Sequence, residues 1–205
     1  MTPDTVNAPD QPSLTKTLTA LAAHAQTRPN AAAILDDAES ISYQTLWQDL
    51  CRTISALGPI VPAPDALVAV EWTSPYRHIL LLLALEHFGV VTATYRPQEI
   101  AGDYQRLFAH SDLIAAATIR PHKETLTILC NDMWWERTLS EPADPAAICD
   151  SKPAVNHRIA SSSGTTGAPK FMMRTCAQSE FRFGQNQMRL GLTPNSRLVL
   201  PASFA

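Results

Sequence analysis

The chain has 205 residues, a net charge of −3, and 45% hydrophobic against only 17% charged residues. A chain of this length can bury one substantial core, and so apolar a composition excludes a disordered polypeptide. Its 16 basic and 19 acidic residues are spread along the sequence without a basic patch, which excludes an electrostatic footprint for nucleic acid.

Helices and strands are expected to alternate along the chain after a polar, proline-rich and flexible N-terminus, residues 1–12. The predicted helices span residues 13–26, 43–57, 75–88 and 98–110, the first capped by Ser13. The predicted strands span residues 32–35, 41–43, 66–70, 90–95, 113–118 and 126–130. The longest apolar run, residues 79–85, is far short of the roughly 20 residues of a membrane span. We interpret it as part of a buried helix and expect no membrane span.

The order of these elements predicts the fold class. Residues 66–70 form a continuous apolar strand and residues 90–95 another strand, on either side of the helix 75–88, which is the βαβ pattern of a buried parallel sheet. The pattern then repeats through residues 98–118. We therefore expect an α/β protein with a doubly wound, mostly parallel sheet flanked by helices.

The stretch 131–156 is rich in Pro, Asp and Trp and lacks clear periodicity, so it is interpreted as a long surface connection. Trp134 and Trp135 in it could border a substrate pocket, but a tryptophan pair more often anchors a loop onto the core. The anchor is the interpretation we favour.

The segment 159–170 has the most biased composition in the chain, with five hydroxyl side chains, two glycines and one lysine in twelve positions. A triphosphate bound with Mg²⁺ needs inward-pointing backbone N–H groups, hydroxyls, close backbone approach and a cation. The segment offers all of these. We call residues 161–170, SSSGTTGAPK, the phosphate loop.

The phosphate loop differs from the P-loop of nucleoside triphosphatases. That motif places its lysine directly after the second glycine and a Ser or Thr after the lysine. Here Ala168 and Pro169 follow Gly167, and Phe171 follows Lys170, so a Walker-type phosphotransferase is disfavoured. Because Pro169 disfavours a helix, an extended strand is expected after the loop, at residues 171–174.

The phosphate loop resembles the Ser/Thr/Gly-rich signature of the adenylate-forming (AMP-binding) superfamily, which includes acyl-CoA synthetases, luciferases and peptide-synthetase adenylation domains. Residues 41–58, 66–99 and 190–205 also resemble segments of that family, so that residues 13–205 resemble the N-terminal part of its adenylation domain. One departure is Phe171-Met172, where the family usually has Gly-Val.

The resemblance implies an ATP-dependent ligase that joins a carboxylic acid to ATP as an acyl adenylate and then transfers the acyl group to coenzyme A or a carrier pantetheine. It implies that ATP phosphates, with Mg²⁺ bound to them, contact residues of the loop. These residues are Ser162, Ser163, Gly164, Thr165, Thr166, Gly167 and Lys170. The family's catalytic lysine and its adenine and ribose contacts come later than residue 205, so no catalytic residue is assigned within this chain.

Two hypotheses remain open from the sequence. One is an N-terminal fragment of such a ligase, incomplete and inactive by itself; the alternative is a naturally short, non-catalytic module that binds a nucleotide or a partner.

None of the six histidines has ligand spacing with carboxylates or cysteines, so no metal is assigned to protein side chains. Cys176 has no identifiable histidine partner and is not expected to be a nucleophile. Four widely spaced cysteines and the lack of a signal sequence favour a reducing cytoplasm.

Overall fold

The computed structural model describes residues 15–35, 39–72, 74–96, 105–117, 125–148, 156–162, 170–193 and 196–198. The helices are α1 (Lys16–Thr27), α2 (Tyr43–Leu57), α3 (Pro75–His87), α4 (Gln105–Ala109), α5 (Asp132–Ser140), the 3₁₀ helix η2 (Pro145–Ile148) and α6 (Cys176–Leu190). The strands are β1 (Ala32–Leu35), β2 (Ser40–Ser42), β3 (Leu67–Glu71), β4 (Val91–Tyr95), β5 (Leu113–Ala116), β6 (Leu126–Leu129), β7 (Asn156–Ser162) and β8 (Lys170–Thr175).

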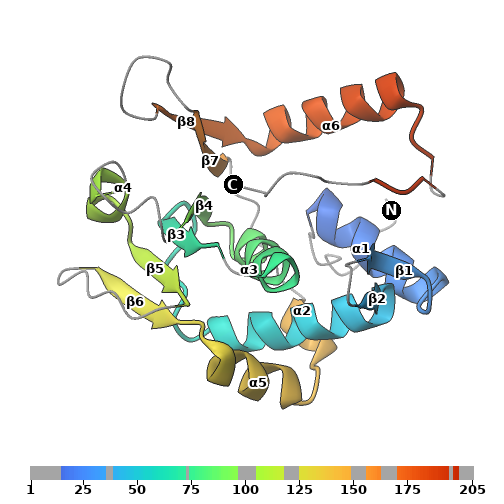
Figure 1. Ribbon diagram of the computed structural model, residues 1–205, viewed down its shortest axis with the longest axis horizontal. Coiled ribbons are helices and arrows are strands. Elements are labelled where there is room, and N and C mark those ends of the chain that lie inside the picture. The colour runs from blue at the N-terminus through green and yellow to red at the C-terminus, as the bar shows by residue number, and fades with distance from the viewer. Residues whose placement is uncertain are drawn as a thin grey trace, which may run out of the picture.

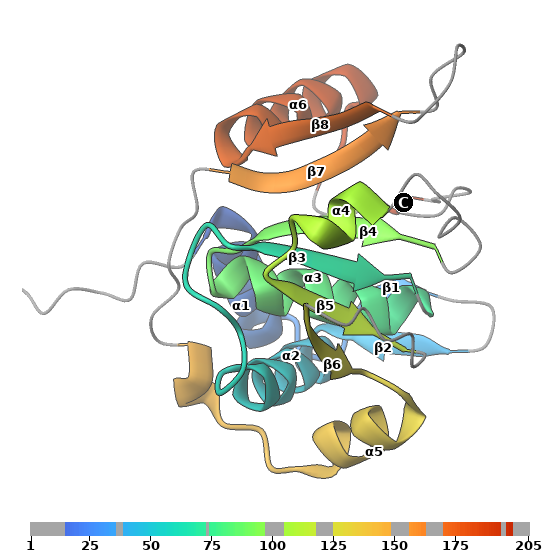
Figure 2. The same cartoon turned by 90° about the vertical axis from the view of Figure 1, so that its left-hand side faces the viewer.

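A six-stranded sheet in the order β6-β5-β3-β4-β7-β8 forms the centre of the molecule. All its neighbouring strands are parallel except β7 and β8, which are antiparallel. The chain passes from β3 to β4 on one side of β3 and then returns to place β5 on the other side (Figure 2). The doubly wound, mostly parallel sheet expected from the sequence is confirmed, and β1 and β2 form the expected separate hairpin.

Each face of the sheet has its own apolar core. Val68 and Val70 of β3 point to the face on which α1, α2, α3 and α5 pack. Ala69, between them, points to the opposite face, where it packs with Leu107 and Phe108 of α4. Successive side chains of a strand point to opposite faces, so a central strand needs apolar residues at every position. The uninterrupted apolar run of β3 follows from this position.

Side-chain caps fix where the main helices begin. The hydroxyl of Ser42 accepts a hydrogen bond from the backbone of Thr45 and opens α2, and Ser74 does the same for α3 with Pro75 in the first turn. Gly89, at a φ of 70°, lets the chain turn from α3 into β4. These two helices begin where the sequence predicts. The first helix does not, because Thr15 and not Ser13 caps α1.

Two further expectations were wrong or incomplete. The stretch 131–156 is not an irregular connection throughout, since α5 forms within it, capped by Asn131. Residues 176–190, for which no element was expected, form α6. Of the helix predicted over residues 98–110, the structure describes residues 105–109 as α4, and residues 98–104 lie outside the described residues.

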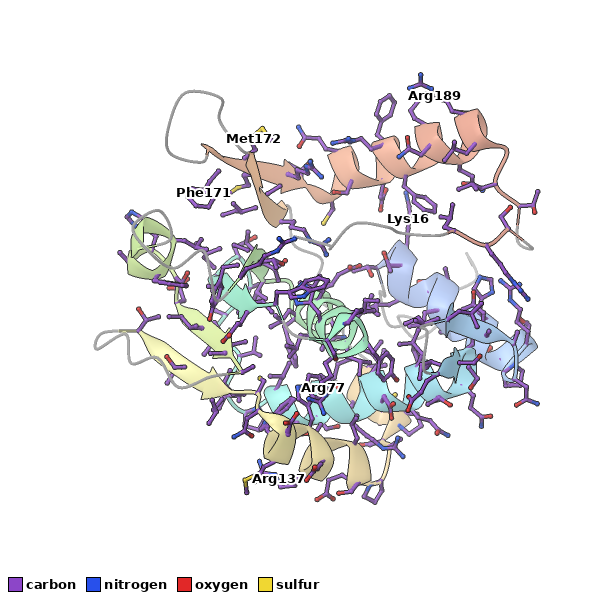
Figure 3. The ribbon with its side chains drawn as sticks, viewed as in Figure 1. Lys16, Arg77, Arg137, Phe171, Met172 and Arg189 are labelled. Carbon is purple, nitrogen blue, oxygen red and sulfur yellow. The ribbon has the colours of Figure 1, made fainter. Side chains whose placement is uncertain are left out.

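The tryptophan pair anchors α5 to the core, as favoured from the sequence. The exposed fraction of Trp135 is 0% and that of Trp134 is 9%, and their rings are 4.8 Å apart in an edge-to-face arrangement. Arg77 of α3, which is labelled in Figure 3, lies over the Trp135 ring, 5.9 Å from its centroid. Arg77 also forms an ion pair with Asp132. These contacts join α5 to α3.

Replacing Trp135 by alanine is expected to lower the free energy of unfolding by about 3–5 kcal/mol, because it leaves a large cavity under α5. Urea denaturation followed by circular dichroism measures the change. Met133, on the same helix and 76% exposed, provides the control: Met133→Ala should change stability by less than about 0.5 kcal/mol. Equal effects of the two substitutions would contradict the anchoring role of Trp135.

Candidate phosphate-binding site

The two ends of the phosphate loop are held together by the β7–β8 hairpin. Ser162, the last residue of β7, is the register partner of Lys170, the first residue of β8. Between them, Ser163, Gly164, Thr165, Thr166 and Gly167 lie outside the described residues, as do Ala168 and Pro169. The structure thus places the backbones of two of the seven candidate residues side by side. The strand expected over residues 171–174 is confirmed as β8.

The turn end of the hairpin lies at the carboxyl edge of the parallel sheet. β7 runs parallel to β4, with Ala93 beside Ile159, so Ser162 and the ends of β3, β4 and β5 all lie toward the same edge. Ligands of open α/β sheets bind outside the carboxyl ends of the strands. The phosphate loop therefore begins and ends where this fold class binds its ligands.

Buried polar and aromatic groups fix the neighbouring strand ends at this edge. The Glu71 carboxylate, 3% exposed at the end of β3, accepts a hydrogen bond of 2.9 Å from the backbone N–H of Ala117. The backbone N–H of Trp72 donates to the carbonyl of Tyr95 at 2.8 Å. Tyr95 in turn packs edge-to-face on Phe108, with centroids 4.8 Å apart. These contacts join the ends of β3, β4 and β5 to one another.

These edge residues were not among the candidates expected from the sequence. A signal was available, because Glu71 and Trp72 come directly after the apolar run of a predicted parallel strand, where side chains of the carboxyl edge are found. Their hydrogen bonds to Ala117 and Tyr95 join segments 46 and 23 residues apart, respectively, by the difference in residue numbers. Such pairings depend on strand order, which the sequence does not show.

Phe171 and Met172, the departure from the family pattern, lie on β8 beyond the loop (Figure 3). Their exposed fractions are 37% and 47%, and that of Met173 is 53%. β8 is the edge strand of the sheet, so these bulky side chains are accommodated at its margin.

Among the described residues, no group of three or more His, Cys, Asp or Glu side chains is arranged to hold a metal ion, and no helix is long and apolar enough to cross a membrane.

No protein-family model and no curated protein sequence matches this chain. Solved structures do match its fold. o-Succinylbenzoate CoA synthetase (MenE) from Bacillus subtilis, in complex with the acyl-adenylate intermediate OSB-AMP, is 17% identical with a TM-score of 0.66, over 85% of this chain and 46% of that chain. VinN is 19% identical with a TM-score of 0.69, over 89% of this chain and 48% of that chain. The same MenE in complex with ATP and magnesium ion is 15% identical, with a TM-score of 0.65, over 84% of this chain and 47% of that chain.

The chain thus has the fold of adenylate-forming enzymes, as the resemblance of its phosphate loop implied. It spans about half the length of the structures that it matches.

Cys176, which begins α6 directly after β8, has the properties of an unactivated thiol. Burial raises its pKa above the ordinary 9.0, and the carboxylates of Glu86 and Glu180 raise it further. A raised pKa leaves less of the nucleophilic thiolate at neutral pH. Cys51 and Cys130 are fully buried, and burial raises their pKa values to about 11 and about 12.

At neutral pH, iodoacetamide is expected to alkylate Cys176 more slowly in the folded protein than in the urea-unfolded chain, because the folded state holds less thiolate. The difference should narrow as the pH rises above 9. Peptide mass spectrometry after timed quenching measures the rates, with Cys51 and Cys130 as slower internal controls. Faster alkylation of Cys176 in the folded protein would identify it as an activated nucleophile.

Proposed function

We propose that this chain provides the phosphate-binding part of an ATP-dependent, carboxylate-activating ligase. The observation on which the proposal chiefly rests is the position of the phosphate loop, whose ends are paired through Ser162 and Lys170 at the carboxyl edge of the parallel sheet. Its composition and the fold shared with MenE and VinN support the same reaction class.

In the proposed reaction, a carboxylate oxygen of the acid attacks the α-phosphorus of ATP. The bond from that phosphorus to the bridging oxygen breaks, and pyrophosphate leaves as the acyl adenylate forms. Because both reactants are anions, catalysis consists mainly of positioning and charge neutralisation. Coenzyme A or a carrier pantetheine would accept the acyl group from the adenylate in the complete enzyme.

Within this scheme the phosphate loop binds the β- and γ-phosphates and holds the leaving pyrophosphate. Ser162, Ser163, Thr165 and Thr166 offer hydroxyl and backbone donors. Gly164 and Gly167 permit close approach of the backbone, and Lys170 balances the negative charge. Mg²⁺ bound to the phosphates neutralises the remaining charge. The chain's own part of the reaction is thus binding and orientation, and we expect it not to complete adenylation alone.

A non-catalytic, partner-binding module is the second candidate, and one observation favours it. In α6 no residue is buried, and Phe181, Phe183, Met188 and Leu190 are each at least 64% exposed. Exposed apolar groups gathered on one element are typical of surfaces that another polypeptide covers. Acid-dependent exchange of pyrophosphate into ATP distinguishes the candidates, since only a ligase catalyses it.

Replacing Lys170 by alanine is expected to weaken MgATP binding about 10- to 100-fold, because a charge-assisted hydrogen bond contributes about 1.5–3 kcal/mol. Isothermal titration calorimetry on the whole chain measures the affinity. Lys170→Arg, which keeps the charge, should lose less.

Lys16→Ala removes the same charge from an exposed side chain on α1 that pairs with Glu180. It should leave MgATP affinity unchanged. Equal affinities of the Lys170→Ala and Lys16→Ala variants would reject the assignment of the phosphate loop.

A further inference from the structure

Two arginines face each other across the β7–β8 hairpin. Arg158 of β7 and Arg174 of β8 are register partners in the antiparallel pair. Arg158 is also the register partner of Thr92 in the parallel neighbour β4. Paired residues of adjacent strands point to the same face of a sheet. The two guanidinium groups therefore extend from the same face, close to one another.

That face is the one on which α3 packs. His78 of α3 is fully buried, and its Nε2 lies 3.1 Å from the hydroxyl oxygen of Thr94, two residues beyond Thr92 on β4. Alternate residues of a strand share a face, so Thr92, Thr94 and Arg158 all point toward α3. The arginine pair and His78 thus belong to one layer between the sheet and α3.

This layer contains a buried nitrogen atom without a partner. Within the part of the chain that the structure describes, Nε of Arg158 is buried and has no hydrogen-bond partner. Neither Arg158 nor Arg174 forms an ion pair with a described residue. Like charges directly opposite in a sheet destabilise it, and a partly buried guanidinium group that is not directly paired with a carboxylate adds to the cost.

The charges around the arginine pair leave an excess of positive charge. Burial lowers the pKa of Arg158; the Glu86 carboxylate opposes this shift, and the neighbouring Arg174 adds to it. Glu86 already accepts a hydrogen bond of 2.6 Å from the hydroxyl of Thr15. Burial and Arg158 together lower the pKa of His78 to about 4, so this ring is neutral at neutral pH. Among the described residues, two guanidinium groups against the one carboxylate that acts on Arg158 leave one positive charge to be balanced.

We propose that Arg158 and Arg174 bind an oxyanion, the phosphate or carboxylate group of a ligand, between the hairpin and α3. An oxyanion accepts several charge-assisted hydrogen bonds at once and matches the planar fork of a guanidinium, so it satisfies the buried donors and balances the charge. Buried polar groups without partners often mark the place of an ion.

This oxyanion site is separate from the phosphate loop. Arg158 precedes Ser162 by four residues along β7, which corresponds to about 13 Å in an extended strand. The arginine pair lies near the open end of the hairpin, next to the Asn156–Thr175 pair, whereas the loop joins the two strands at the turn end. It does not depend on the nucleotide-binding proposal, and the two can fail independently.

The test follows the thermal unfolding midpoint of the whole chain at neutral pH and constant ionic strength, with inorganic phosphate or acetate added. Binding to the folded state raises the midpoint in a saturable manner. Arg158→Gln/Arg174→Gln should abolish this rise, and each single substitution should weaken the apparent affinity about tenfold or more. Arg182→Gln/Arg189→Gln removes two exposed arginines of α6 and should keep the full response.

A second double variant keeps the test decisive if the glutamine variant fails to fold. Arg158→Leu/Arg174→Leu replaces the buried charges by apolar groups, which is often neutral or stabilising, so the unliganded protein should fold while its response to the anion is lost. A response to phosphate alone, acetate alone or both identifies which oxyanion the site accepts. The absence of any rise in the unfolding midpoint would overturn the inference, and so would a rise that survives the leucine substitutions. A rise that Lys170→Ala abolishes would also overturn it, because that result would assign the anion to the phosphate loop.

Discussion

The parallel pairing of β3 with β4 is the contact on which the rest of the structure depends. Five register pairs, from Leu67–Val91 to Glu71–Tyr95, join the two strands. Both strands are covered on both faces, so their side chains are mainly apolar; the exceptions are Thr92 and Thr94 of β4, which face α3, and Glu71, at the end of β3. Because the strands are parallel, all their carboxyl ends meet at one edge. The phosphate loop has its place at this edge because β7 is added parallel to β4.

The β7–β8 hairpin stands apart from the body in two respects. It is the antiparallel part of the sheet, and with α6 it forms a layer beside the compact body of α1 to α5 (Figure 1). Its side chains differ in polarity and exposure. Phe171, Met172 and Met173 are apolar and exposed, whereas Arg158 is charged and partly buried. An exposed apolar edge strand is a surface that proteins usually cover. The solved structures that match this chain are about twice as long, so each contains further polypeptide in addition to the matched part.

Much of the fold could be predicted because local signals agreed with the tertiary structure. The helix α2 has its cap Ser42, its apolar stripe and its terminating position all within one segment. The helix α6 was missed although Thr175 and Gln178 form a capping box and Gly191 ends it in the left-handed conformation. No residue of α6 is buried, so its apolar side chains form no core stripe of the kind that marks α2. For α5, the Pro- and Asp-rich surroundings concealed a helix of only nine residues.

The sequence by itself determined the fold class and the chemical character of the phosphate loop. Both depend on residues close together in the chain: the apolar runs that alternate with amphipathic helices, and the Ser, Thr, Gly and Lys residues of one short segment. The tertiary structure alone decided which distant residues meet: the backbones of Ser162 and Lys170 at the carboxyl edge, and Arg158 opposite Arg174 beneath α3. The physical reason is that strand order and register are fixed by packing across the whole sheet, and local sequence does not determine that packing.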